Sequence, residues 1–425
     1  MCLGAAYCGP PAARLAPPAP VLPGGADACA LSSAAGTVPE TLSVALTGTV
    51  DPRNAPVARN AAERFVFRQL YETLIRVDCQ GQPQPGLARS WASAESGHDW
   101  TFTLRPDATF WDGLPVTASD VAAAWRDASR LPAGVTVLVR GERELGVRFS
   151  HATSVVPSLL ADPAWSVAKP AAGDAWPMGT GAFRPDTAGG HFTLVPLVGA
   201  RPTVEIRSRD AGDMRDLLDA GVDLLVTGEP APLSYAADRT DLTTVPLPWD
   251  STYILLAQGT IAISAGVRVG LARDAVRVDA RPAEGPYWWA DPAGCDLEPP
   301  PGAGATPFQP VHPVWTAARG DPPARDLTDR LVALGLTGGD TAVRAVTLEP
   351  DAFAAALAAG RSAGYVLAVP RHPLAPCGAM RELVARAPWL PGGVIVALVD
   401  TRRHVIVRRG AGAFTVDWDG TLRLR

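Results

Sequence analysis

The histidines and cysteines of this 425-residue chain are the side chains best suited to metal binding and nucleophilic chemistry. Neither set has the spacing that such chemistry needs: there is no His-x-His, His-Glu-x-x-His or Cys-x-x-Cys pattern. These patterns predict isolated structural or surface histidines, no cofactor or metal, and no enzyme activity. An enzyme of unknown type is kept only as a minor hypothesis. The histidines are His98, His151, His191, His312, His372 and His404.

The six cysteines are consistent with disulfides if the protein is exported, because oxidising compartments preserve them. Cys295 and Cys377 are the favoured pair, since both lie in the second half of the chain. Isolated buried or free thiols are an equal alternative.

Three adjacent aromatic residues, Tyr287, Trp288 and Trp289, lie in a Pro/Gly-rich passage at 281–313. Aromatic side chains bury a large area and are enriched at binding surfaces. One interpretation is that the three residues form a pocket wall. The other is that they anchor a long loop to the core.

Composition indicates a globular protein of two or three domains. The chain is 47% hydrophobic and 19% charged, and its 42 prolines and 41 glycines predict many loops and short regular elements. A formal net charge of −5 makes nucleic acid an unsuitable partner. No apolar run reaches the about 18 residues of a membrane-spanning helix.

The segment from Phe65 to Asp127 has the clearest periodicity. Apolar residues on two neighbouring stripes predict a helix that continues to Ile75, and alternation predicts a strand at Trp100–Leu104. Thr117 and Asp120 resemble a capping box at the start of a second helix, with Asp in place of Glu. The two stripes of the first helix are Val66, Leu70 and Leu74, and Phe67, Tyr71 and Ile75.

The same segment resembles a known family. Tyr71–Leu74 reads YETL, Pro85–Trp91 reads PGLARSW, and Thr101–Val121 follows the pattern TFxLRxxxxFxDGxPxTAxDV. These landmarks, in this order over about sixty residues, are similar to those of the bacterial extracellular solute-binding proteins of family 5. The resemblance implies an α/β, two-lobed periplasmic-binding-protein-like fold of type II, with mixed sheets, a hinge and a central cleft. The second lobe is expected to be trimmed.

The resemblance also implies a domain division. Residues 1–38 are expected to form a poorly ordered N-terminal segment, 39–248 the first lobe, 249–390 the second lobe, and 391–425 a return to the first lobe. Residues 267–278 resemble a helix of the family in decayed form, with Gly270 inserted into its pattern. Gly179–Phe183 (GTGAF) is similar to a family motif, and we expect a structural turn near the cleft because no Lys-Ser/Thr follows as in a phosphate loop.

Four ligand-binding candidates follow from the resemblance. The loop before the first helix often faces the ligand in the family, which makes Asn60 and Arg64 candidates; a solvated loop and helix start is the alternative. Trp249 and Tyr253 lie in the expected crossing to the second lobe and are hinge-side candidates, or else core aromatics. Tyr287, Trp288 and Trp289 complete the candidate set.

The resemblance implies a receptor of an ABC importer that binds an oligopeptide or a similar small solute between its lobes. The expected partners are that ligand and a transporter permease, with no nucleic acid, and the receptor is expected to be a monomer. A periplasmic or cell-envelope location is expected, although no basic region precedes an apolar one near the N-terminus. The alternative is a protein that keeps the binding fold but has lost transport and acts as a ligand sensor or scaffold.

Overall fold

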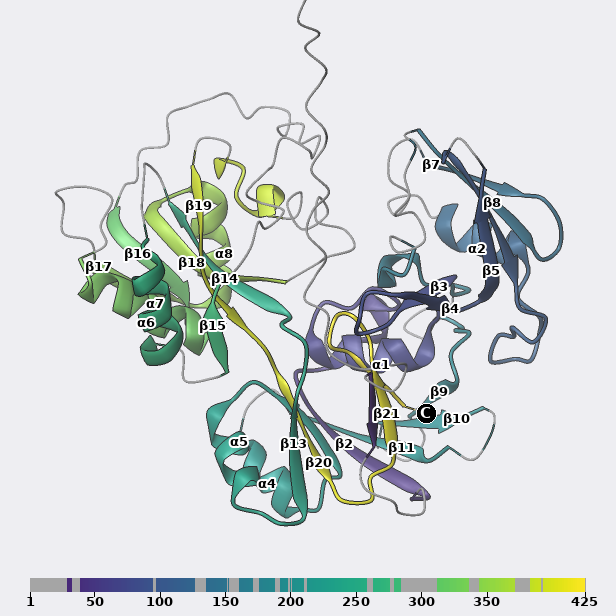
Figure 1. Cartoon of the computed structure of the whole chain (residues 1–425), viewed down its shortest axis with the longest axis horizontal. Helices are drawn as coiled ribbons and strands as arrows, with labels where there is room; N and C mark the ends of the chain where they lie inside the picture. Colours follow the sequence, from purple (N-terminus) through teal and green to yellow (C-terminus); the bar gives the residue numbers. More distant parts are fainter. Residues whose placement is uncertain are drawn as a thin grey trace, which may run out of the picture.

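The computed structural model shows two α/β lobes joined by two strand connections (Figure 1). No helix in the part of the chain that it describes has both the length and the apolar character needed to cross a membrane. The described residues are 29–32, 39–94, 97–126, 135–150, 152, 160–170, 176–187, 192–197, 199, 201–209, 212–257, 263–275, 279–283, 312–335, 344–370, 383–390 and 393–424.

A seven-stranded mixed sheet is the centre of the first lobe, with strand order β13-β20-β12-β2-β11-β10-β9. β2 is parallel to both of its neighbours, and five of its seven residues are buried. This burial explains its nearly continuous apolar run, as expected for a parallel strand covered on both faces. The strands are β2 (Thr41–Thr47), β9 (Phe183–Asp186), β10 (Phe192–Pro196), β11 (Thr203–Arg209), β12 (Leu224–Thr227), β13 (Leu242–Pro246) and β20 (His404–Arg408).

Helices cover both faces of this sheet. Val44 packs in a cluster with residues of α1 (Ala61–Leu70), whereas Ala45 packs with residues of α4 (Met214–Asp219). Successive side chains of a strand point to opposite faces, so α1 and α4 lie on opposite sides. α5 (Pro230–Ala237) lies beside α4 (Figure 1).

A four-stranded antiparallel sheet extends the first lobe, in the order β5-β6-β8-β7. The predicted strand at Trp100–Leu104 is confirmed as β6. The capping box is confirmed too: Asp120 Oδ2 accepts from the Thr117 amide at 2.9 Å, and Thr117 Oγ1 accepts from the Asp120 amide at 3.2 Å. These elements are β5 (Ala88–Ser93), β6 (Asp99–Leu104), α2 (Ala118–Arg126), β7 (Val135–Val139) and β8 (Glu144–Phe149).

The predicted helix to Ile75 is too long, because α1 ends at Leu70 and Tyr71 has an extended backbone. Ile75 begins β3 (Ile75–Val77), which pairs with β4 (Pro83–Pro85). The apolar residues after Leu70 are buried in their new positions. Their pattern therefore indicated that these residues are buried. A short apolar run does not show whether buried residues form a helix or a strand.

The six-stranded sheet of the second lobe has the order β15-β19-β14-β18-β16-β17. α7 (Pro322–Ala333) packs on the face that carries Leu255, and α8 (Pro350–Ala359) packs on the face that carries Ile254. The described part of the expected helix at 267–278 is helical: α6 (Ala265–Gly270) continues as a π-helical segment, η4 (Leu271–Ala275), and residues 276–278 lie outside the described residues. The strands are β14 (Ser251–Ala257), β15 (Ala280–Pro282), β16 (His312–Ala318), β17 (Arg344–Leu348), β18 (Ser362–Pro370) and β19 (Val394–Thr401).

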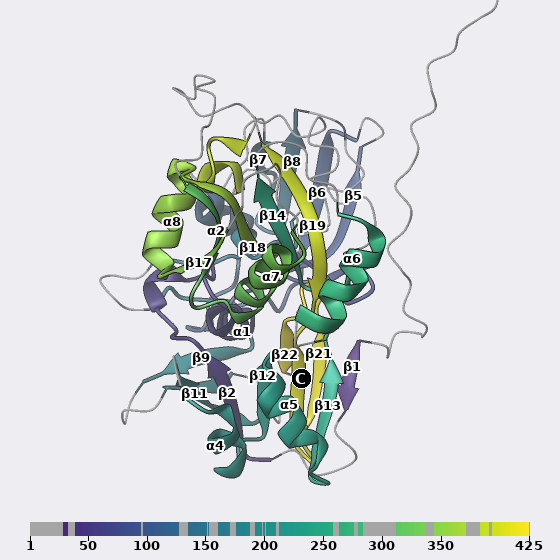
Figure 2. The ribbon, with the colours of Figure 1, turned by 90° about the vertical axis from the view of Figure 1, so that its left-hand side faces the viewer.

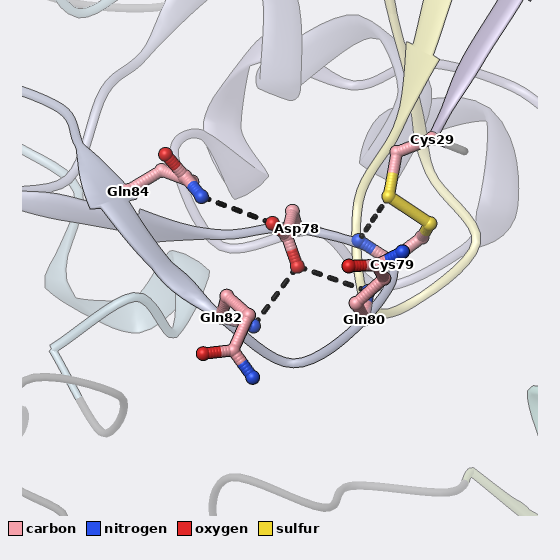
Figure 3. Close-up of a disulfide and its surroundings, with 6 residues drawn as sticks. All are labelled: Cys29, Asp78, Cys79, Gln80, Gln82 and Gln84. Carbon is pink, nitrogen blue, oxygen red and sulfur yellow. Dashed lines mark hydrogen bonds between the residues drawn. A yellow bond between two sulfur atoms is a disulfide. The ribbon is translucent and has the colours of Figure 1, made fainter. Parts of the chain in front are cut away.

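The two ends of the described chain meet in a small three-stranded sheet, in which β21 (Ala413–Val416) pairs with β1 (Ala30–Ser32) and β22 (Leu422–Leu424). A disulfide joins Cys29, next to β1, to Cys79, next to β3 (Figure 3). Within the N-terminal segment to residue 38, residues 29–32 contain this strand and one end of the crosslink, and residues 1–28 and 33–38 lie outside the described residues. The favoured pair, Cys295 with Cys377, lies outside the described residues.

Two adjacent segments connect the lobes: 247–250, between β13 and β14, and Arg402–Arg403, between β19 and β20. They are hydrogen-bonded to each other, because the Leu247 amide donates to the Arg403 carbonyl at 2.9 Å. Figure 2 shows β19 beside β14 of the second lobe. The chain was expected to return to the first lobe at residue 391. In the structure β19 still pairs with β14 and β15 of the second lobe, and the chain passes to the first-lobe sheet at Arg402.

Candidate functional site

A cleft of about 990 Å³ lies between the two lobes beside the connecting segments. The first lobe contributes the ends of β2 and β12, at Thr47 and Thr227. Both strands are parallel and reach the cleft at their carboxyl ends, which is where open α/β sheets bind ligands. The second lobe contributes Tyr253 of β14 and the loop before α7.

Three helices begin at this cleft. Ala61 and Ala62 of α1, Pro230 of α5, and Pro322 of α7 all line it. The prolines occupy the first helical position of α5 and α7, where the missing N–H costs nothing. A helix start carries a partial positive charge, so the convergence of three starts makes the cleft favourable for negative groups.

Arg64 lies in the first turn of α1 and lines the cleft, where the sequence predicts a ligand contact. Its side chain makes no ion pair or hydrogen bond with another residue of the described chain. Burial lowers the pKa of its guanidinium below the usual value, and the positive charge of Arg403 lowers it further. Arg64 therefore presents a partly desolvated charge without a protein partner.

Asn60 has a structural role. Its Oδ1 accepts from the Glu63 amide at 2.9 Å as the N-cap of α1, and its Nδ2 donates to the Thr49 carbonyl at 2.9 Å. It does not line the cleft. Its position matches the helix-start alternative, and Asn60 contributes by fixing the direction in which α1 enters the cleft.

Trp249 lies in a connecting segment but does not line the cleft. Its ring lies between two guanidinium groups, with the Cζ of Arg402 at 4.5 Å and that of Arg281 at 4.8 Å from the ring centroid. Arg402 also pairs with Asp279 at 2.6 Å, and Arg281 pairs with Asp400 at 3.1 Å. In this structure Trp249 is a packing element of the connection.

Tyr253 lines the cleft and is also part of the core of the second lobe. Its hydroxyl donates to Asp321 Oδ1 at 2.9 Å, and the same carboxylate accepts from the Ala324 amide as the N-cap of α7. Burial raises the pKa of both Tyr253 and Asp321. Tyr253 thus ties β14 to the start of α7 at the edge of the cleft.

The remaining predicted site residues, Tyr287, Trp288 and Trp289, lie outside the described residues. The structure adds cleft residues that the sequence patterns did not indicate, such as Glu229, Asp250 and Arg403. Of these, Glu229 had a local signal, because Glu229-Pro230 is a helix-start pair. Such pairs mark helix starts, which can be placed at a site only when the sheet order is known.

An acidic and basic cluster lies behind the cleft. Arg68 pairs with Asp419 at 2.6 Å and with Asp417 at 3.4 Å, and Arg423 pairs with Asp417 at 2.8 Å. Burial alone would raise the pKa of Asp419, but the charges of Arg68 and Arg64 and the Thr421 amide outweigh it and lower the pKa to about 2. This cluster joins α1 to the turn before β22.

The GTGAF segment forms the turn that the sequence predicts, but it packs against the end of α1 and not in the cleft. The Gly181 amide donates to the Leu70 carbonyl at 2.9 Å. A Cβ at Gly181 would lie 2.2 Å from the Gln69 carbonyl oxygen, and one at Gly179 would lie 2.1 Å from that of Leu70. These glycines permit a close approach of two backbones.

The described residues contain no group of three or more His, Cys, Asp or Glu side chains that could hold a metal ion.

The chain has two lobes with a cleft between them, and known proteins share its sequence landmarks or its fold. The model of the bacterial extracellular solute-binding proteins, family 5 Middle, matches residues 82–190. Periplasmic oligopeptide-binding protein OppA of Haemophilus influenzae is 47% identical over 64 residues, which are 15% of this chain and 12% of OppA. The nickel-binding periplasmic protein of Escherichia coli is 34% identical over 99 residues, which are 23% of this chain and 19% of that protein.

The structural match is much longer than the sequence match. NikA from Brucella suis, in complex with Fe(III)-EDTA, superimposes with a TM-score of 0.63 at 16% identity, covering 91% of this chain and 100% of that one. The expected fold class is thereby confirmed. The family match and the shared fold together confirm the resemblance to the family 5 solute-binding proteins.

Proposed function

We propose that this protein is the extracytoplasmic receptor of an ABC importer and binds an oligopeptide or a similar small solute in the cleft between its lobes. The observation that carries this proposal is the cleft itself, formed by both lobes beside their connecting segments. Its volume of about 990 Å³ is at the upper end of the range usual for small-molecule sites, which run to about 1,000 Å³. The relatives that share its sequence landmarks include oligopeptide-binding and nickel-binding proteins.

Closure of the lobes explains how such a receptor signals that it is loaded. Among the described residues the lobes are connected by 247–250 and Arg402–Arg403, so rotation about these segments changes the width of the cleft while both sheets stay intact. A solute that touches Thr227 in one lobe and Tyr253 in the other gains its second set of contacts only when the cleft narrows. It therefore stabilises the closed form, which would dock on the transporter permease.

The Cys29–Cys79 disulfide supports a location outside the cytoplasm, in the periplasm or cell envelope, because disulfides persist in oxidising compartments. The net charge of −5 is unsuited to nucleic acid. We expect the receptor to act as a monomer with no catalytic step, since binding and closure require only the two lobes and the cleft.

A thermal-shift screen against di- and tripeptides and Ni²⁺ tests this function. A solute present at 100 times its Kd stabilises the folded state by about 2.7 kcal/mol, which raises the melting temperature by several degrees. Ala61→Trp fills the cleft and should abolish the shift, whereas Ala237→Trp, at an exposed position of α5, should retain it. The function is contradicted if no solute shifts the wild type, or if Ala61→Trp responds equally.

A ligand sensor or scaffold that has lost transport is the second candidate. The observation in its favour is the short α6 and the π-helical segment, where the family pattern predicts one longer helix. Ligand binding with no uptake by cells that carry the partner permease would favour this alternative.

A further inference from the structure

We propose that Arg64 is a binding residue for a carboxylate group, and that the solute of this cleft therefore carries a free carboxylate. The inference deepens the proposed function and depends on it, because it names the chemical class of the solute. It is based on the charged side chains of the cleft and on how each one is already paired.

The cleft has more positive than negative side chains, and most of them are paired. Arg403 pairs with Asp250 at 2.6 Å, Arg402 with Asp279 at 2.6 Å, and Arg325 with Asp326 at 3.5 Å. Its arginines are Arg64, Arg325, Arg402 and Arg403, and its carboxylates are Glu229, Asp250 and Asp326.

Arg64 differs from the other three arginines because its side chain has no ion-pair or hydrogen-bond partner within the described chain. The negative groups that act most strongly on it, Asp419 and Asp250, are held by Arg68 and Arg403. A partly desolvated charge is costly without a partner. A bound anion would supply that partner and would be held strongly for the same reason.

Neither Glu63 nor Glu229 neutralises the charge of Arg64. Glu63, beside Arg64, does not line the cleft, and its carboxylate accepts from the amides of Asp51 and Arg59 and from Asn54 Nδ2. Glu229 is exposed at the start of α5, where the partial positive charge of the helix favours it. The start of α1, at Ala61 and Ala62, adds a favourable field for an anion beside Arg64.

A carboxylate fits this arrangement better than a phosphate. A guanidinium donates two parallel hydrogen bonds to either group. One unpaired guanidinium, however, balances one negative charge, and a phosphate dianion would leave a second charge without a partner in the cleft.

Isothermal titration with matched acid and amide probes tests the inference: trialanine and trialanine amide, L-histidine and L-histidinamide, glutarate and glutaramide, and inorganic phosphate. At least one acid should bind the wild type about 10- to 100-fold more tightly than its amide, which is the range of a charge-assisted hydrogen bond. Arg64→Gln should remove this preference, and Arg64→Lys should restore part of it. Arg148→Gln, at an exposed arginine paired with Asp99 in the four-stranded sheet, should retain it.

The melting temperature of the ligand-free protein separates binding from a structural role. Arg64→Gln should leave it unchanged or raise it, because the guanidinium has no protein partner to lose, whereas a structural arginine would lower it. Equal binding of acids and amides, preferred binding of phosphate, or an unchanged preference in Arg64→Gln would overturn the inference and leave the receptor function intact. Failure of every probe, acid or amide, to bind would instead count against both proposals.

Discussion

The guanidinium of Arg403 lies 2.6 Å from the carboxylate of Asp250, so that one ion pair joins the two segments that connect the lobes. The Asp250 side chain is 9% exposed and that of Arg403 is 22% exposed. Both residues also line the cleft. The connection on which the lobes would rotate is therefore held by charges that a bound solute can approach.

Asp250→Asn should lower the free energy of unfolding by about 1–3 kcal/mol, because it leaves a largely buried guanidinium without its anion. Urea unfolding followed by tryptophan fluorescence measures the change. The matched control is Asp99→Asn, which breaks the exposed pair with Arg148 and should have little effect. Equal losses in the two variants would show that the Arg403–Asp250 pair contributes no more than a surface pair.

Asp419 should give the protein an acid-sensitive component of stability. Its pKa is lowered from 3.8 to about 2 in the folded protein. A carboxylate with a depressed folded pKa contributes stability above its unfolded pKa and loses it as the pH falls through the folded value. The free energy of unfolding should therefore decrease as the pH falls from about 4 to about 2.

Asp419→Asn should flatten this decrease and cost about 3 kcal/mol at neutral pH, because Arg68 is 6% exposed and keeps only the longer contact with Asp417. Chemical unfolding at a series of pH values measures both effects. If the free energy of unfolding of Asp419→Asn falls with pH as steeply as that of the wild type, the acid sensitivity comes from another group.

Tyr253→Phe should destabilise the second lobe by about 1–2 kcal/mol, because Asp321 loses one of its two hydrogen bonds in a partly buried position. Tyr235→Phe is the matched control: Tyr235 also donates to a carboxylate, that of Asp219, but on the exposed surface of α5. We expect little change there. Thermal unfolding of both variants checks the difference, and similar losses would contradict the importance of burial.

Gly181→Ala should be among the most damaging single-methyl changes, with a loss above about 3 kcal/mol, since its Cβ would lie 2.2 Å from the Gln69 carbonyl oxygen. The same change at Gly270, where no atom lies within 4 Å of the added Cβ, should be neutral or stabilise α6 by up to about 1 kcal/mol. Melting temperatures of the two variants measure the contrast. A mild effect at Gly181 would mean that the two backbones can separate.

The sequence by itself determined the local elements whose signals lie within a few residues. The strand at Trp100–Leu104 and the capping box of Thr117 and Asp120 followed from period-two alternation and from a short-range pair of hydrogen bonds. The motifs from Tyr71 to Val121 carried the family resemblance, because each motif is short and the motifs follow one another in the expected order.

Only the tertiary structure decided the end of α1 and the composition of the site. The apolar residues after Leu70 are buried in a turn and a strand, and burial alone does not reveal which element provides it. Arg64 and Arg403 are 339 positions apart in the sequence. They line one cleft because the connection between β19 and β20 lies beside the segment 247–250, which connects the lobes in the other direction. Local residue patterns do not show that these two connections are neighbours. That Arg64 has no partner within the described residues likewise became visible only when the charges of those residues had been placed.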